Sequence, residues 1–107
     1  MPPHAVILEV AFATTPGCRD AFLTALRDVV AGSRAEAGCV TYHATADLDD
    51  PLAFHLLEIW ESEAAYLAHR DGTALARFRD VLPVCGQVTR MVRNKAMLTA
   101  YEPPARA

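Results

Sequence analysis

Hydrophobic residues recur at two spacings along the chain, every second residue in some stretches and every third or fourth in others. The first spacing predicts strands and the second predicts helices. The predicted strands are Ala5–Phe12, Cys39–Ala46, Phe54–Trp60 and a long last strand from Gln87 to about Ala100. The predicted helices run from Pro16 to about Ala35, from about Glu63 to Arg70 and from about Thr73 to Leu82. This order, β-α-β-β-α-β with the second helix broken in two, predicts an α+β, ferredoxin-like antiparallel sheet with helices on one face.

Residues at the ends of the predicted helices support these limits. Thr15 is expected at the N-cap of the first helix, directly before a proline that suits the first helical position. Ser62 is expected to cap the second helix, because its hydroxyl can accept a hydrogen bond from the first turn. Gly38 suits a left-handed stop after the first helix. Pro83 and Gly86 are expected to end the third helix.

The predicted strand Phe54–Trp60 is largely apolar on both of its faces. A strand with a single buried face would alternate apolar and polar residues. Because the predicted helices cover one face of the sheet, the other face needs cover from elsewhere. Two such sheets can cover each other, and we therefore expect a homodimer in which His55, Leu57 and Ile59 lie in the interface.

The short connection after Ala46 suggests a hairpin register that places His43 opposite His55 and Tyr42 opposite Leu56. Tyr42 then shares one face with the even-numbered residues of the next strand. His43 and His55 share the other face, as a hydrogen-bonded interface pair or as two ligands of a metal.

Composition limits the classes of protein and of partner. The chain has 107 residues, which predicts a single domain with a core from about 5 to 100 and a loose tail over 102–107. Hydrophobic residues make up 52% and charged residues 21%, as in globular proteins. A net charge of −3 gives no support for nucleic-acid binding.

The chain also lacks signals for membranes, export and metal binding. No apolar run approaches the roughly 20 residues of a membrane span, and no signal-peptide pattern is present. Cys18, Cys39 and Cys85 have no zinc-site spacing, so we interpret them as reduced cysteines of a cytoplasmic protein. No glycine-rich nucleotide or flavin fingerprint occurs, and neither a cofactor nor a metal is expected.

The stretch from Glu58 to His69 has the pattern E-x-W-E-S-x-x-A-Y-x-x-H. Upstream, Ser-Arg at positions 33–34 is followed by Glu36, Gly-Cys at 38–39, Tyr42 and Asp-Pro at 50–51. Together these pieces resemble the antibiotic biosynthesis monooxygenase family of the dimeric α+β barrel superfamily, over about residues 5 to 100. The resemblance implies a dimer whose paired sheets form a barrel, with the long last strand reaching across.

The resemblance also implies a ligand cavity between the sheet and its helices. Trp60, Tyr42 and Glu58 would border it from the sheet, and His69 would approach from the helical side. The residues expected to bind substrate are Glu58, Tyr66, Phe78 and Leu56.

The implied reaction is cofactor-independent oxidation of an aromatic phenol or quinol by O2. An electron-rich phenolate can itself transfer an electron to O2, so the protein supplies a base, a stacking surface and a charge. In this interpretation His69 is the base, Trp60 stacks on the substrate, and Tyr42 and Arg90 stabilise negative charge. The first predicted strand lacks the Asn that haem-degrading relatives use, which argues against haem degradation.

Structural roles stay open for each of these residues. Trp60 and Tyr42 could simply pack in the core, and His69 could cap the last carbonyls of its helix. Glu58 could form an ion pair with Arg90, Arg93 or Arg34. Two other functions also stay open: an isomerase or cyclase that works by proton transfer, and a non-catalytic ligand-binding protein.

Overall fold

Four strands and three helices make up residues 4–99, the part of the chain that the computed structural model describes. The strands are β1 (Ala5–Thr14), β2 (Cys39–Ala46), β3 (Ala53–Trp60) and β4 (Gly86–Ala96). The helices are α1 (Arg19–Arg34), α2 (Glu63–Arg70) and α3 (Thr73–Cys85), and a short 3-10 turn, η1 (Pro16–Cys18), precedes α1. The predicted end of the last strand near residue 100 and the predicted loose tail lie outside the described residues.

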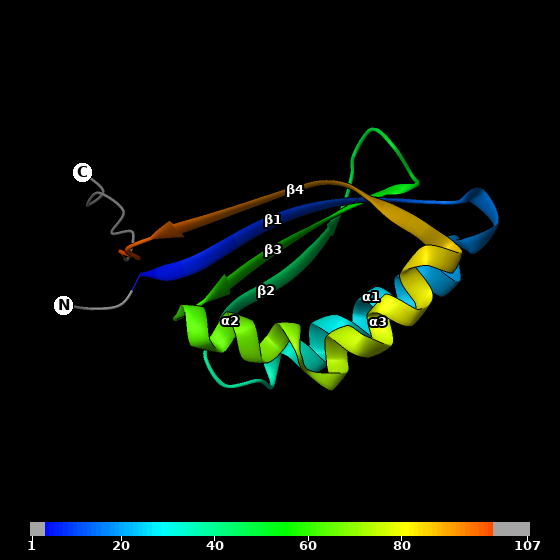
Figure 1. Cartoon of the computed structure of the whole chain (residues 1–107). Helices are drawn as coiled ribbons and strands as arrows, with labels where there is room; N and C mark the ends of the chain where they lie inside the picture. Colours follow the sequence, from blue (N-terminus) through cyan, green and yellow to red (C-terminus); the bar gives the residue numbers. More distant parts are fainter. Residues whose placement is uncertain (1–3, 100–107) are drawn as a thin grey trace, which may run out of the picture.

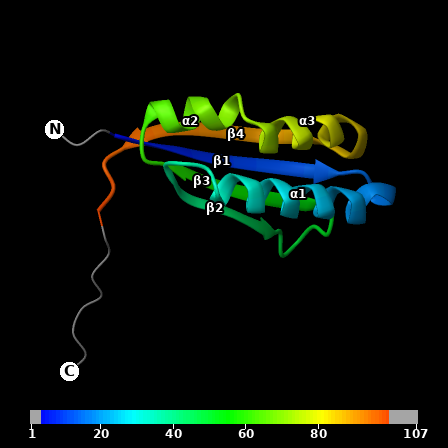
Figure 2. The same cartoon turned by 90° about the horizontal axis from the view of Figure 1, so that it is seen from below.

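The sheet has the strand order β2-β3-β1-β4, and every neighbouring pair is antiparallel. The three helices lie on one face of this sheet, and the other face carries no helix within the described residues (Figure 1). Viewed from below, α1 and α3 run side by side along the sheet (Figure 2). This arrangement confirms the predicted α+β, ferredoxin-like fold.

Two aromatic groups fill the space between the sheet and the helices. The first is formed by four phenylalanines whose ring centroids lie 5.5 to 5.8 Å apart: Phe12, Phe22, Phe54 and Phe78. The second comprises Tyr42, Trp60 and His69. All seven side chains are buried, so the core is continuous along the covered face.

Two of the predicted helix ends are confirmed. The backbone N–H of Ala65 donates to Ser62 Oγ at 3.1 Å, which makes Ser62 the N-cap of α2. Gly38 has φ +80°, the left-handed conformation that favours glycine after a helix.

Two other predicted ends are wrong in detail. The Thr15 side chain does not cap α1, because the 3-10 turn η1 stands between them. Helix α3 continues through Pro83 to Cys85. Pro83 lies in the last turn, where its missing N–H removes a single helix hydrogen bond, to the carbonyl of Arg79, and the chain still completes the turn. The helix then ends at Gly86, as predicted, where the N–H of Gly86 donates to the carbonyl of Leu82.

The predicted register of the β2–β3 hairpin is wrong by two residues. Tyr42 lies opposite Glu58, His43 opposite Leu57, and Thr45 opposite His55. The connecting loop is two residues longer than predicted, and Asp47 Oδ1 shapes it by accepting hydrogen bonds from the backbone N–H groups of residues 49 and 50 at 2.8 and 3.1 Å. Because a shift of two residues keeps every side chain on its face, the predicted division of residues between the two faces still holds.

Candidate active site

A buried histidine lies at the centre of the second aromatic group. His69 occupies the last turn of α2 and is 2% exposed. Its Nδ1 lies 2.7 Å from Oε1 of Glu36, a residue of the loop after α1, and its Nε2 lies 3.4 Å from Oε1 of Glu58 on β3. Since an ionised carboxylate can only accept, the hydrogen bond to Glu36 keeps the proton on Nδ1 and directs Nε2 toward Glu58.

Two aromatic rings fix the orientation of this imidazole. The Trp60 ring stacks on it with centroids 4.4 Å apart and an interplanar angle of 26°. Tyr42 meets it edge-on at 5.4 Å. Trp60 also donates a hydrogen bond from Nε1 to Glu58 Oε1 at 3.1 Å, so that the same indole holds both the imidazole and the carboxyl.

Burial shifts the ionisation of two groups at this site. Desolvation raises the pKa of Glu58, and the hydrogen bond from Trp60 and the nearby His69 only partly oppose this effect. Desolvation, followed by the neighbouring Glu58, raises the pKa of Tyr42 far above its ordinary value. Tyr42 therefore stays a neutral phenol and can act as a hydrogen-bond donor but not as a base.

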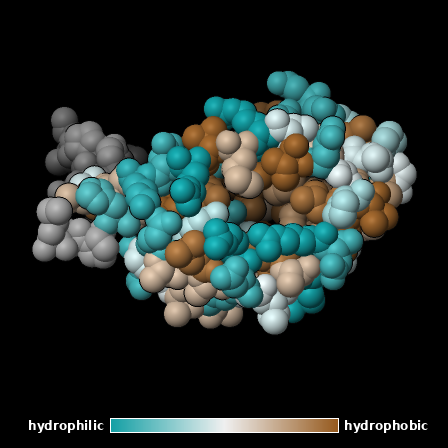
Figure 3. Space-filling view, in the orientation of Figure 1, coloured by the Kyte–Doolittle hydropathy of each residue, from teal (hydrophilic) through white to brown (hydrophobic). Residues whose placement is uncertain are grey.

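A cavity of about 310 Å³ opens beside His69 and Glu58, between the sheet and the helices α2 and α3. Most of its walls are apolar side chains of β1, β4 and α3, such as Val10, Met91 and Phe78. Figure 3 shows hydrophobic residues gathered around a hollow between sheet and helices. Two exposed arginines, Arg70 and Arg79, also line the cavity, and Arg79 Nη1 donates to the carbonyl of Arg70 at 3.1 Å.

The cavity brings together six of the eight predicted site residues: His69, Tyr42, Glu58, Tyr66, Phe78 and Leu56. The structure does not bring Trp60 and Arg90 to it. Trp60 has no exposed surface and lies behind His69, so it contacts the imidazole and not the cavity. Its geometry is that of a positioning residue.

Arg90 lies on the opposite face of the sheet. It pairs with Ala11 of β1, next to a bulge in β4, and shares a concavity of about 400 Å³ with Glu9, His43 and His55. The predicted ion pair between Arg90 and Glu58 is therefore excluded, since the sheet separates the two side chains. On the helical face, Arg93 lies 5.6 Å over the Tyr66 ring and Arg70 and Arg79 are the cations nearest the substrate space.

The predicted histidine pair on the open face is also replaced by another contact. His55 Nε2 lies 2.8 Å from Asp47 Oδ2, and this hydrogen bond lowers the pKa of Asp47. Residues 4–99 hold no group of three side chains suited to bind a metal ion. None of their helices is long and apolar enough to cross a membrane.

Sequence reasoning missed Glu36 and Arg79. Glu36 belongs to the motif that carries the family resemblance, but it stands 33 residues before its partner His69, and no local pattern links the two. Arg79 stands four residues after Leu75, which belongs to the apolar stripe of α3, and residues at this spacing lie on the same face of a helix. This spacing could have indicated that Arg79 faces the cavity.

Residues 5–81 match the family model of the antibiotic biosynthesis monooxygenases. The chain belongs to this family. No curated protein sequence matches it.

Solved structures of similar fold agree with this assignment. A protein from Pseudomonas aeruginosa is 27% identical, with a TM-score of 0.78 over 94% of this chain and 99% of that one. A candidate antibiotic biosynthesis monooxygenase from Deinococcus radiodurans is 20% identical, with a TM-score of 0.76 over 94% and 99% of the two chains. A second candidate from Chloroflexus aurantiacus is 19% identical, with a TM-score of 0.77 over 91% and 97%.

Proposed function

We propose that this protein is a small cofactor-independent monooxygenase that oxidises an aromatic phenol or quinol with O2. The observation that carries the proposal is the buried His69, held by Glu36 at Nδ1 and facing Glu58 with Nε2, beside a largely apolar cavity. A cavity of about 310 Å³ is at the lower end of the roughly 300–1,000 Å³ of small-molecule pockets, which favours a substrate of two or three rings.

Proton removal is the first step that the geometry supports. A substrate in the cavity would lose a proton to the pair formed by His69 Nε2 and Glu58, which are close enough to share it at 3.4 Å. The raised pKa of Glu58 favours this step, because a carboxyl with a pKa nearer neutrality can both accept and return a proton.

Oxygen then takes electrons from the substrate anion itself. One electron passes to O2, the resulting superoxide and substrate radical combine into a C–O bond, and the hydroperoxide loses water to leave a carbonyl. The sum for a methylene group is CH2 + O2 → C=O + H2O, so no external reductant is required. For a quinol, two electrons and two protons pass to O2 and give a quinone and hydrogen peroxide.

The groups that would stabilise developing negative charge are the Tyr42 phenol and the guanidinium of Arg79. Arg79 takes the role that the sequence suggested for Arg90, which lies across the sheet.

Proton-transfer isomerisation or cyclisation is a second candidate. It is favoured by the same pair, because Glu58 and His69 could remove a proton from one carbon and return it to another without O2.

We also propose a homodimer through the open face of the sheet. Leu57 on this face is 36% exposed, and Ile7 and Ile59 beside it on β1 and β3 are half-buried, although the described part of the chain places no element over them. A second sheet would remove this apolar surface from water.

Oxygen uptake with anthrone as probe tests the monooxygenase against both alternatives. We expect uptake above the uncatalysed rate, incorporation of isotope-labelled oxygen into the product, and loss of both in His69→Gln. The control is His55→Gln, across the sheet from the cavity, which should keep full activity in protein whose dimer is intact by light scattering. A product of unchanged composition would favour the isomerase, and quenching of Trp60 fluorescence without any turnover would favour a binding protein.

A further inference from the structure

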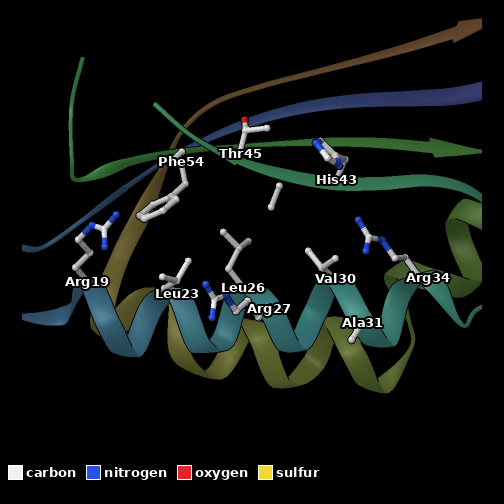
Figure 4. Close-up of a pocket in the computed structure, with 12 residues that line it drawn as sticks. Arg19, Leu23, Leu26, Arg27, Val30, Ala31, Arg34, His43, Thr45 and Phe54 are labelled. Atoms are coloured by element: carbon white, nitrogen blue, oxygen red, sulfur yellow. The ribbon is translucent and has the colours of Figure 1, made fainter. Parts of the chain in front are cut away.

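A second concave site lies on the other side of α1 from the candidate active site. It occupies about 550 Å³ between α1 and the edge strand β2 (Figure 4). Its lining comes from one side of α1, from residues 43–46 of β2 and from Phe54 of β3. None of these residues lines the cavity beside His69. We call it the α1–β2 groove.

The groove combines an apolar floor with a cationic rim. Leu23, Leu26 and Val30 of α1 form the floor together with Phe54. Three arginines of the same helix, Arg19, Arg27 and Arg34, stand around it, and Figure 4 shows their side chains beside the apolar ones. None of the described residues that line the groove is acidic. The whole chain has more acidic than basic residues and a net charge of −3, so its overall composition does not account for a groove with three arginines and no acidic residue.

Two of the arginines are held in place by backbone carbonyls. Arg34 Nε donates to the carbonyl of Tyr42 at 2.9 Å, and Arg19 Nε donates to the carbonyl of Pro51 at 2.8 Å. Among residues 4–99, no carboxylate forms an ion pair with Arg19, Arg27 or Arg34. The terminal N–H groups of Arg19 and Arg34 are therefore pre-oriented and free to bind an anion in the fork geometry that suits a carboxylate.

The spacing of the arginines indicates the shape of the ligand. They follow one another at intervals of eight and seven residues, about two turns or roughly 10–12 Å along the helix. At this distance they cannot converge on one small dianion, and the surface between them is apolar. A ligand that satisfies both features has one carboxylate at an arginine and an extended apolar body along the floor.

We propose that the α1–β2 groove binds a small amphiphilic monocarboxylate, such as a medium-chain or aryl-alkyl acid, at a site distinct from the candidate active site. Its volume lies within the roughly 300–1,000 Å³ of small-molecule sites. Charge complementarity selects the headgroup, and the leucine and valine floor selects the tail.

Titration calorimetry of the full chain with decanoate tests the site. Arg19, Arg27 and Arg34 are each changed to Gln in separate variants. Loss of the arginine that holds the carboxylate should weaken decanoate binding about tenfold, the effect of one charged hydrogen bond, and loss of either other arginine, about two turns away, should change it little. Decanamide, which has the same tail without the charge, should bind at least about tenfold more weakly than decanoate. Arg79→Gln, at the mouth of the other cavity, is the matched control and should leave the affinity unchanged.

Backbone amide shifts locate the ligand independently of the variants. In NMR spectra, decanoate should change the chemical shifts of backbone amides in α1 and β2 and should leave those of α2 and α3 unchanged. Equal affinity of decanoate and decanamide, equal loss in Arg79→Gln, or shifts centred on α2 would each overturn the proposal. A second copy of the chain could also occupy the groove. In that case decanoate binding would weaken as the protein concentration rises, and Arg27→Gln would have a lower mass than the parent by light scattering. These two results together would also overturn the proposal.

Discussion

The two faces of the sheet carry the same chemical pair, a histidine beside a carboxylate, in opposite surroundings. On the helical face, His69 and Glu36 lie 2.7 Å apart and the histidine side chain is 1% exposed. On the open face, His55 and Asp47 lie 2.8 Å apart and the histidine side chain is 47% exposed. The distances are nearly equal, so any difference in chemistry comes from burial.

Burial changes what each pair can do. Within a single chain, solvent screens the pair on the open face, and exposed pairs of this kind contribute about 0–1 kcal/mol to its stability. On the helical face the imidazole of His69 is removed from water and stacked against Trp60, while Glu36 keeps a 26% exposed side chain. A second carboxyl, Glu58, lies on the other side of this imidazole, and burial raises its pKa. A histidine–carboxylate distance is therefore poor evidence of a reactive site unless desolvation and a neighbouring cavity accompany it.

The largest predicted effect concerns the open face as an interface. Leu57→Glu places a carboxylate in the proposed dimer contact, where an unpaired buried charge costs several kcal/mol, so the dimer should weaken by more than about a thousandfold. Light scattering should then report a monomer. The matched control is Leu48→Glu, since Leu48 in the β2–β3 loop is 101% exposed and should tolerate the charge. An unchanged dimer in Leu57→Glu would exclude this face.

The second predicted effect is on the rate of probe oxidation, which should depend on His69 and not on His55. His69→Gln removes the proposed base and should lower the rate of probe oxidation by about 100-fold or more, in the range for general bases. His55→Gln removes a histidine that lies across the sheet from the cavity, so it should leave the rate unchanged in protein that light scattering shows to be dimeric, and any effect on stability should act through the proposed interface. Initial rates and thermal unfolding of both variants check the comparison. Equal activity of His69→Gln and the parent would remove His69 from the mechanism.

The third effect concerns the carboxylate that orients His69. Glu36→Gln keeps an acceptor near Nδ1 but lowers its strength, so the rate should fall about tenfold, a loss of roughly 1.4 kcal/mol. Because Glu36 acts through the imidazole, the pH profile of the rate should also move, which a merely structural role would not cause. Asp47→Asn, at the exposed pair, is the control. An unshifted profile in Glu36→Gln would make Glu36 a structural residue only.

Much of the fold could be predicted from local patterns. The alternation in Phe54–Trp60 gave the faces of β3 correctly, because side-chain direction in a strand follows from the backbone alone. Ser62 and Gly38 were predicted correctly for the same reason, since capping depends on neighbouring residues.

Features that depend on distant contacts could not be predicted in this way. The β2–β3 register was missed because the connecting loop takes up two more residues than predicted, where Asp47 and Asp50 accept hydrogen bonds from the loop backbone. Trp60 was expected at the cavity wall, but α2 brings His69 between the indole and the cavity. The bulge in β4 and the pairing with β1 decide the face of Arg90, and neither leaves a periodic signal in the sequence.

The smallest predicted effect is on stability and concerns the buried carboxyl of the helical face. Burial raises the pKa of Glu58 in the folded state, so the folded protein binds this proton more tightly than the unfolded chain. Its contribution to stability is therefore fully present below the unfolded value of about 4.3 and declines as pH rises through the raised folded value. Glu58→Gln removes this decline and keeps an acceptor for Trp60 Nε1, so the free energy of unfolding of the variant should gain on the parent between about pH 4 and neutrality.

The control for this comparison carries the opposite sign. Lys95 lowers the pKa of the half-buried Glu63 through a hydrogen bond of 2.7 Å, so the stability from Glu63 is present above its unfolded pKa and is lost as pH falls. Glu63→Gln should thus lose stability relative to the parent as pH rises, while Glu58→Gln gains it. Urea unfolding of the three proteins across this pH range measures both differences. Parallel curves for Glu58→Gln and the parent would mean that Glu58 is no harder to ionise in the folded protein than in water, and the acid–base role proposed for it beside His69 would lose its physical basis.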